Sequence, residues 1–225
     1  MLLVFDFDGT LVDSIRDLAE SASDLSEEYG GRRLDVLTVT MMVGEGAHTL
    51  VERILTEAGV ADRPPGALSR FLEIYDRRML DHTTPYAGMI ETLTAVGRSH
   101  GLAMLTNKPE QATRRIMSHT GLDRFFEDCV FGDGTLPRKP DPEGLRWLMG
   151  RQGASAPQTW LVGDSDVDVA TARAAGVQLC VARYGFGFSR IDTATLRPDD
   201  VIIDRPQELL AALPASGSIA RRSPS

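Results

Sequence analysis

Cysteine, excess positive charge and long apolar runs are all scarce in this sequence. There are two cysteines, Cys129 and Cys180, each within an apolar stretch, and no C-x-x-C pair. A zinc site built on cysteine pairs and a disulfide-rich secreted scaffold are therefore excluded. Two thiols placed in this way are expected to be packing residues of a protein in a reducing compartment.

Basic residues are fewer than acidic ones. The chain has 24 Lys and Arg against 32 Asp and Glu, which gives a formal net charge of −8. That balance argues against nucleic acid or an anionic membrane as a partner, because no basic excess is available to neutralise phosphates. A local basic pocket for one small anion is compatible with it. The N-terminus has no basic region, and its apolar run is too short for a signal peptide or a membrane span. We expect a cytoplasmic protein.

Short apolar runs alternate with helix-length segments through most of the chain. This alternation predicts an α/β fold with a doubly wound, mostly parallel, Rossmann-like sheet. The strands are expected at residues 2–5, 102–105, 129–131, 160–162, 177–182 and 201–203. The helices between them are expected at residues 87–99, 110–120, 142–152 and 168–175.

Residues 15–82 contain no strand-like run. Apolar residues at helical spacing predict three helices there, at 15–29, 48–58 and 65–81. We therefore expect a core of residues 1–14 and 83–214, with residues 15–82 inserted as a small all-helical cap. The tail, residues 215–225, lacks periodicity and is expected to be disordered. A chain of 225 residues accommodates one domain of about 150 residues plus such an insertion.

Polar side chains follow four of the expected strands, closely in three cases and at the end of a loop in the case of the third strand. In a doubly wound sheet the carboxyl ends of the strands meet at one edge, where ligands bind. The residues concerned are Asp6 and Asp8, then Thr106, Asn107 and Lys108, then Arg138 and Lys139, then Asp164, Ser165 and Asp168. The sequence therefore predicts a site that combines several carboxylates, a hydroxyl and at least one ammonium group.

Crowded carboxylates are tolerable when a hard divalent cation such as Mg²⁺ lies between them. Such a cation keeps some of its waters and takes an oxygen of a bound phosphate, while a lysine and a threonine hydroxyl hold the others. Asp6, at the strand tip, is then placed to attack phosphorus as a covalent nucleophile. Asp8 is placed to protonate the leaving oxygen and later to deprotonate the hydrolytic water.

The segments D-F-D-G-T-L-V-D-S, L-T-N-K, K-P-D-P and V-G-D-S-D-V-D resemble, in order, the four motifs of the haloacid dehalogenase-like hydrolase superfamily. The resemblance implies a Mg²⁺ ion held by the side chains of Asp6 and Asp164 and by the backbone carbonyl of Asp8. The other roles that it implies are phosphate binding by Thr106 and the Asn107 backbone, charge balance by Lys139, and support of the metal site or of Lys139 by Asp168.

Within that superfamily, several features favour a phosphatase with a helical cap. Asp8 is an acid that the dehalogenase branch lacks. The sugar-phosphate mutase branch usually has a histidine where Leu18 stands, and it tends to have an arginine in the cap loop, where this chain has Gly44-Glu45-Gly46. The phosphonate-cleaving branch needs a cap lysine, and residues 15–82 contain none.

The segments D-S-I-R-D-L, V-G-E-G-A-H-T-L-V-E-R, P-Y-A-G and T-N-K-P resemble bacterial phosphoglycolate phosphatases. The resemblance implies hydrolysis of 2-phosphoglycolate, a small phosphorylated metabolite, and Arg53 is the candidate cation for its carboxylate. That group more often has Asn where Glu45 stands. Relatives that act on pyrophosphate, nucleotides or sugar phosphates share the core motifs and stay as alternatives. A non-enzymatic, receiver-like phospho-acceptor module is a further alternative, which the position of Asp6 after the first strand and the helical insertion oppose.

Overall fold

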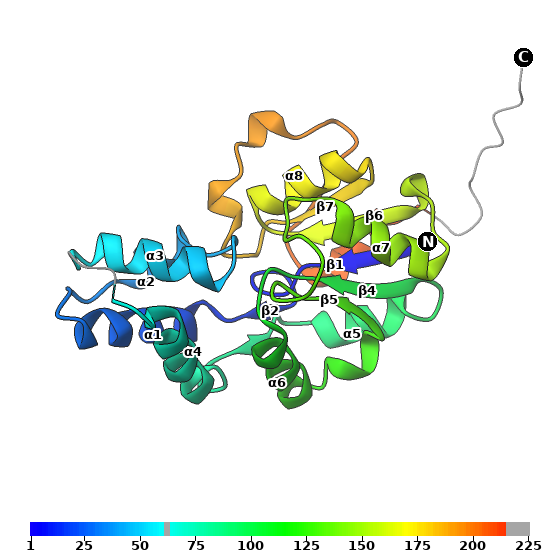
Figure 1. The fold of residues 1–225 in the computed structure, drawn as a ribbon. Coiled ribbons are helices and arrows are strands. Elements are labelled where there is room, and N and C mark those ends of the chain that lie inside the picture. The colour runs from blue at the N-terminus through cyan, green and yellow to red at the C-terminus, as the bar shows by residue number, and fades with distance from the viewer. Residues whose placement is uncertain (61–63, 215–225) are drawn as a thin grey trace, which may run out of the picture.

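A parallel sheet forms the centre of the molecule in the computed structural model, which describes residues 1–60 and 64–214 (Figure 1). The expected disorder of residues 215–225 lies outside this part of the chain. Within the described residues the sheet has six strands in the order β5-β4-β1-β6-β7-β8, and each neighbouring pair is parallel. The strands are β1 (Leu2–Phe5), β4 (Gly101–Leu105), β5 (Asp128–Val130), β6 (Thr159–Gly163), β7 (Gln178–Ala182) and β8 (Val201–Ile203).

Alternate residues of the central strand β1 pack against helices on opposite faces of the sheet. Leu2 and Val4 belong to the apolar cluster under α7 (Glu143–Gln152) and α8 (Asp166–Ala175). Leu3 and Phe5 belong to the cluster on the opposite face. The helices on that face are α5 (Met89–Val96), α6 (Glu110–Thr120) and α9 (Leu209–Ala212). Both faces of the sheet are therefore covered, as a parallel sheet requires, and the predicted doubly wound fold is confirmed.

Strands are added to the sheet in two directions from the central strand β1. From β1 the chain proceeds to β4 and β5, whereas β6, β7 and β8 extend in the opposite direction. The strand order therefore reverses beside β1, which is the point where doubly wound folds bind their ligands. The loops that follow β1, β4 and β6 meet there.

Four helices lie between β1 and β4 in sequence and form a separate group beside the sheet edge (Figure 1). They are α1 (Ile15–Glu28), α2 (Val36–Thr40), α3 (Ala47–Glu57) and α4 (Ala67–Arg78). Three match the helical periods in the sequence. The short α2 escaped prediction because Val36 and Leu37 are exposed and give no amphipathic period; it begins at Asp35, whose carboxylate accepts the Thr38 N–H at 2.7 Å.

Two short strands connect the helical group to the sheet. They are β2 (Val12–Asp13) and β3 (Thr84–Pro85), and they pair antiparallel. Beside them the buried carboxylate of Asp17 accepts the N–H groups of His82 and Thr83 and the Thr83 hydroxyl. One side chain thus ties together the outgoing and returning connections. Among the described residues, no helix is long and apolar enough to cross a membrane.

Candidate active site

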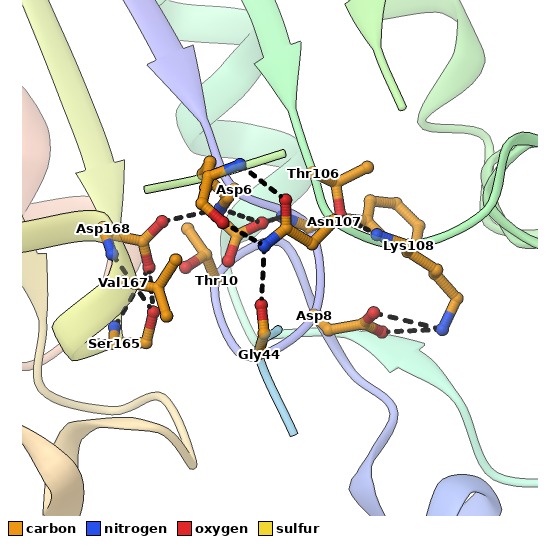
Figure 2. Close-up of polar contacts among 12 residues, drawn as sticks. Asp6, Asp8, Thr10, Gly44, Thr106, Asn107, Lys108, Ser165, Val167 and Asp168 are labelled. Atoms are coloured by element: carbon orange, nitrogen blue, oxygen red, sulfur yellow. Dashed lines mark hydrogen bonds and ion pairs between the residues drawn. The ribbon is translucent and has the colours of Figure 1, made fainter. Parts of the chain in front are cut away.

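Asp6 follows directly on β1 at the centre of the sheet edge (Figure 2). Its N–H donates to the carbonyl of Val162 on β6 at 2.9 Å, so the strand pairing extends to the acid itself. Its Oδ1 accepts the N–H of Phe7 at 2.7 Å. The chain then turns sharply through Gly9, which has φ +85°, a conformation that glycine adopts without strain.

Lys139 comes from the loop after β5 and lies against two acids. Its Nζ is 2.8 Å from Asp6 Oδ1 and 2.6 Å from Asp168 Oδ1, and its side chain is only 2% exposed. Burial by itself would lower the pKa of Lys139, but the carboxylates of Asp168 and Asp6 raise it above its ordinary value. Lys139 is therefore a fixed positive charge beside Asp6.

Asp168 is oriented by the start of helix α8. Its Oδ2 accepts the N–H of Ser165 at 3.1 Å and the Ser165 hydroxyl at 2.6 Å, which makes a reciprocal cap of the helix. Its Oδ1 is left for Lys139. The expected contact between Asp168 and Lys139 is present, and the acid also caps the helix.

Three buried acids form a cluster that suits a cation. Oxygens of Asp6, Asp164 and Asp168 lie within 4.8 Å of one another. Burial raises the pKa of Asp6 and raises that of Asp164 well above the ordinary range, and the neighbouring acids add to both shifts. A single ammonium group, Lys139, offsets the three carboxylates, so the cluster retains negative charge that a divalent cation would neutralise. The residues present therefore fit a metal ion.

The position of Asp164 depends on glycines around it. A Cβ added to Gly9 would lie 2.0 Å from Asp164 Oδ2, and one added to Gly185 would lie 2.6 Å from the same oxygen. The Gly187 N–H donates to that oxygen at 2.7 Å, and the Thr10 hydroxyl lies 3.3 Å from Oδ1. Positions 9 and 185 must therefore be glycine, because a Cβ at either one would overlap this carboxylate.

The Asp8 side chain lies apart from the acidic cluster and contacts Lys108 (Figure 2). The Nζ of Lys108 is 3.0 and 3.1 Å from the two carboxylate oxygens and 2.7 Å from the hydroxyl of Tyr75 on α4. The Ser14 hydroxyl donates to Asp8 Oδ1. Burial would lower the pKa of Lys108, but Asp8 and Tyr75 raise it. Asp8 is thus held by a buried cation that itself contacts the helical group.

The amide of Asn107 joins three segments. Its Nδ2 donates to the carbonyls of Gly44 and Lys139, each at 2.9 Å, and its Oδ1 accepts the Lys139 N–H at 2.9 Å. The side chain therefore holds these loops together, and only the backbone of Asn107 remains available to bind a phosphate. Thr106, the residue before it, accepts the Lys108 N–H at 3.1 Å and lines the same cavity as Asp6.

A cavity of about 60 Å³ lies between the sheet edge and the helical group. Its floor includes Asp6, Asp8, Thr106, Asn107 and Asp164. The lining that the helical group contributes is apolar apart from the Tyr75 hydroxyl and backbone; it includes Leu18, Val43, Leu50, Phe71 and Leu72.

Arg53, the expected cation for the substrate carboxylate, does not line the cavity. Its guanidinium donates to the carbonyl of Met42 at 3.1 Å and pairs with Glu45. The resemblance made Arg53 the candidate cation, but the sequence could not show that its guanidinium would pair with Glu45. The structure brings every other predicted site residue to the sheet edge.

A family model described as haloacid dehalogenase-like hydrolase matches residues 3–182. The chain belongs to the haloacid dehalogenase-like hydrolase family. The predicted family membership is therefore confirmed, and the four motifs lie where their loops meet at the sheet edge.

Relatives of this haloacid dehalogenase-like hydrolase indicate its enzyme class. The plasmid-encoded phosphoglycolate phosphatase of Cupriavidus necator is 36% identical over 99% of this chain and 95% of its own length. The phosphoglycolate phosphatase of Rhodospirillum rubrum is 40% identical over 86% of this chain and 83% of its own. A crystal structure titled as a predicted phosphoglycolate phosphatase from Haemophilus somnus 129PT matches with a TM-score of 0.85 at 27% identity, covering 93% and 96% of the two chains. These likenesses confirm the predicted enzyme class, phosphoric monoester hydrolase.

Sequence reasoning missed the contact between Lys108 and Asp8, although the composition carries a signal for it. Of the 24 basic residues in the chain, 22 are arginines and two are lysines, Lys108 and Lys139. Both lysines of this hydrolase are buried in the site. A chain that uses arginine almost everywhere retains lysine where a compact ammonium group is needed in place of a planar guanidinium.

Proposed function

We propose that this phosphatase hydrolyses 2-phosphoglycolate to glycolate and phosphate, with Mg²⁺, through an aspartyl-phosphate on Asp6. The observation that carries the proposal is that Asp6 and Asp8 line the same small, largely apolar cavity, with Asp6 also belonging to a buried acidic cluster. Curated relatives that match most of this chain and are named phosphoglycolate phosphatases support the choice of substrate.

Asp6 is the nucleophile in this mechanism. Phe7 and Lys139 both contact its Oδ1, so Oδ2 is the oxygen that attacks phosphorus. A P–O bond to Asp6 forms while the bond from phosphorus to the ester oxygen breaks. Thr106 and the Asn107 backbone hold the phosphate oxygens, and Lys139 offsets the charge that accumulates on the transferred group.

Asp8 moves the protons. It gives a proton to the departing glycolate oxygen, and it later takes one from the water that attacks the aspartyl-phosphate. The contacts of Ser14 and Lys108 hold this carboxylate at the cavity that would contain the leaving oxygen.

Mg²⁺ would be held by the side chains of Asp6 and Asp164 and by the backbone carbonyl of Asp8, with Asp168 supporting Lys139. When bound, it would neutralise the clustered carboxylates and the phosphate so that two anions can meet.

Residues 15–82 act as the cap in this proposal. Their apolar lining excludes water from the aspartyl-phosphate until glycolate has left. The cavity, at about 60 Å³, suits a small ester better than a nucleotide. We place the enzyme in the cytoplasm, with a small phosphorylated metabolite as its partner and with neither nucleic acid nor membrane.

A kinetic screen tests the substrate. We expect kcat/KM with Mg²⁺ to be highest for 2-phosphoglycolate among a set that includes pyrophosphate, nucleoside monophosphates and hexose phosphates, because the cavity is small and its cap lining offers no group for a sugar or a base. A higher kcat/KM for any of those compounds would replace phosphoglycolate with that substrate class. Labelling of the protein without turnover would support a phospho-acceptor module instead.

Removal of divalent cations should abolish activity reversibly. The reason is that three buried carboxylates beside one ammonium group repel a phosphate dianion unless a cation offsets them. Activity should disappear in EDTA and return when Mg²⁺ is added in excess, while circular dichroism stays constant. Full turnover in EDTA would exclude the metal from the mechanism.

A further inference from the structure

Arg190 lies at the junction of cap and core and lines the same cavity as Asp6 and Asp8. It ends a short turn after β7, and its side chain is 11% exposed. Its Nη1 donates to the carbonyl of Thr40, at the end of cap helix α2, at 2.6 Å. Its Nε is 3.5 Å from Asp166, an acid whose side chain is 58% exposed.

Two glycines leave space for the guanidinium. A Cβ on Gly44 of the cap would lie 3.0 Å from Arg190 Nη2, and one on Gly187 of the core would lie 3.2 Å from it. Gly44 has φ +132°, so a side chain there would be strained as well as crowded. The backbone on both sides of Nη2 is thus bare, and this nitrogen has no hydrogen-bond partner among the described residues.

The other cations of the site are already neutralised. Lys139 is held between Asp6 and Asp168, and Lys108 pairs with Asp8. Arg190 also lines the cavity, but its ion-pair partner is Asp166, whose carboxylate is exposed to solvent, and its charge acts on the buried carboxylate of Asp164 without a hydrogen bond between these two described residues. The pair with Asp166 is weak, because water screens it.

We propose that Arg190 binds the carboxylate of the substrate and so selects phosphoglycolate; this inference rests on the proposed function. With the phosphorus held at Asp6, the carboxylate of so short a substrate stays inside the same cavity. The cap lining supplies no cation, and Arg53 faces Glu45 instead. A guanidinium suits the role because its planar fork matches a carboxylate with two parallel hydrogen bonds.

The hydrogen bond from Arg190 to Thr40 also links the core to the cap. Because Nη1 binds the cap at Thr40 while Nη2 lies beside Gly44 and Gly187, a carboxylate bound to this guanidinium would also fix its contact with the cap. The charge balance of the site also favours an anionic substrate. The site has four acids and three cations, so its net charge is −1, and a bound divalent cation would make it +1. The acids are Asp6, Asp8, Asp164 and Asp168, and the cations are Lys108, Lys139 and Arg190. Loss of Arg190 would remove the net positive charge.

Two substrates and three variants test the inference. The substrates are 2-phosphoglycolate and ethyl phosphate, which has a methyl group where phosphoglycolate has its carboxylate. For Arg190→Met we expect the ratio of their kcat/KM values to fall about 10- to 150-fold, the range expected when a hydrogen bond to a charged group is lost. The loss should be mainly in KM for phosphoglycolate. Arg190→Lys, which keeps the charge without the fork, should fall between wild type and Arg190→Met, and Arg53→Met should keep the wild-type ratio.

The outcomes separate the inference from the proposed function. A wild-type enzyme with no preference for phosphoglycolate over ethyl phosphate overturns the substrate and the role of Arg190 together. A wild-type preference that persists in Arg190→Met overturns the role of Arg190 alone. An equal loss on both esters also overturns it, because Arg190 would then act only through its contact with the cap. If Arg190→Met fails to fold, the ratio measured with Arg190→Lys decides.

Discussion

Replacing Asp6 by asparagine should lower phosphatase activity by about 10⁴-fold or more, the scale seen when a covalent nucleophile is removed. The amide oxygen can still accept the Phe7 N–H and contact Lys139, so the fold should persist. Removal of one charge from a repelling cluster should leave the melting temperature equal or higher. Steady-state kinetics and a thermal melt of the same preparation measure both effects.

The matched control for Asp6→Asn is Asp123→Asn, an exposed acid in the turn after α6. It should keep wild-type activity. Rapid quenching of the wild-type enzyme should also trap an acid-stable aspartyl-phosphate that Asp6→Asn cannot form. Activity within tenfold of wild type in Asp6→Asn would show that another group attacks phosphorus.

Replacing Lys108 by methionine should lower kcat/KM for phosphoglycolate by about 100-fold, the lower end of what general acid–base catalysis contributes. Methionine keeps the apolar stem but removes the ammonium group that holds both oxygens of Asp8. Acetyl phosphate has a leaving group that needs no proton, so its hydrolysis should fall much less. The difference between the two substrates isolates the effect on Asp8.

Two further variants define the role of Lys108. Lys108→Arg should not restore activity, because the side chain is 5% exposed and a guanidinium is too wide for the space between Asp8 and Tyr75. Tyr75→Phe removes one of the contacts to Lys108 and should show a weaker form of the same substrate dependence. Equal losses in kcat/KM, which reports the steps up to departure of the leaving group, on phosphoglycolate and acetyl phosphate would mean that Lys108 acts on the phosphate or on the fold, and not through the proton that Asp8 gives to the leaving group.

Much of the fold could be predicted because each element carries its own pattern. The apolar runs of β1 and β8 coincide with the observed strands, and α6 has its predicted ends. The elements that escaped prediction are the shortest ones. The two-residue strands β2 and β3 exist only because they pair with each other, and no local period can reveal such a pairing.

Some residues of the candidate site could also be predicted from the sequence, and others could not. Asp6, Asp164 and Lys139 could be predicted because each follows a strand, and parallel strands bring their carboxyl ends to one edge. Arg53 and Arg190 were harder to distinguish, since both are single arginines outside the core motifs. Arg53 lies on a cap helix but pairs with Glu45, whereas Arg190 lies in a turn with no pattern and lines the cavity.

The sequence by itself determined the family, the doubly wound sheet and the identity of the acids at its edge, because strand period and motif order are local properties of the chain. The contact partners of Lys108 and Arg190, in contrast, could be assigned only from the fold. Lys108 meets Asp8 across 100 residues, and Arg190 meets Thr40 across 150. Ion pairing depends on distances of a few ångströms between segments that the fold alone brings together, so the cations on which we base substrate choice and proton transfer could be assigned only from the structure.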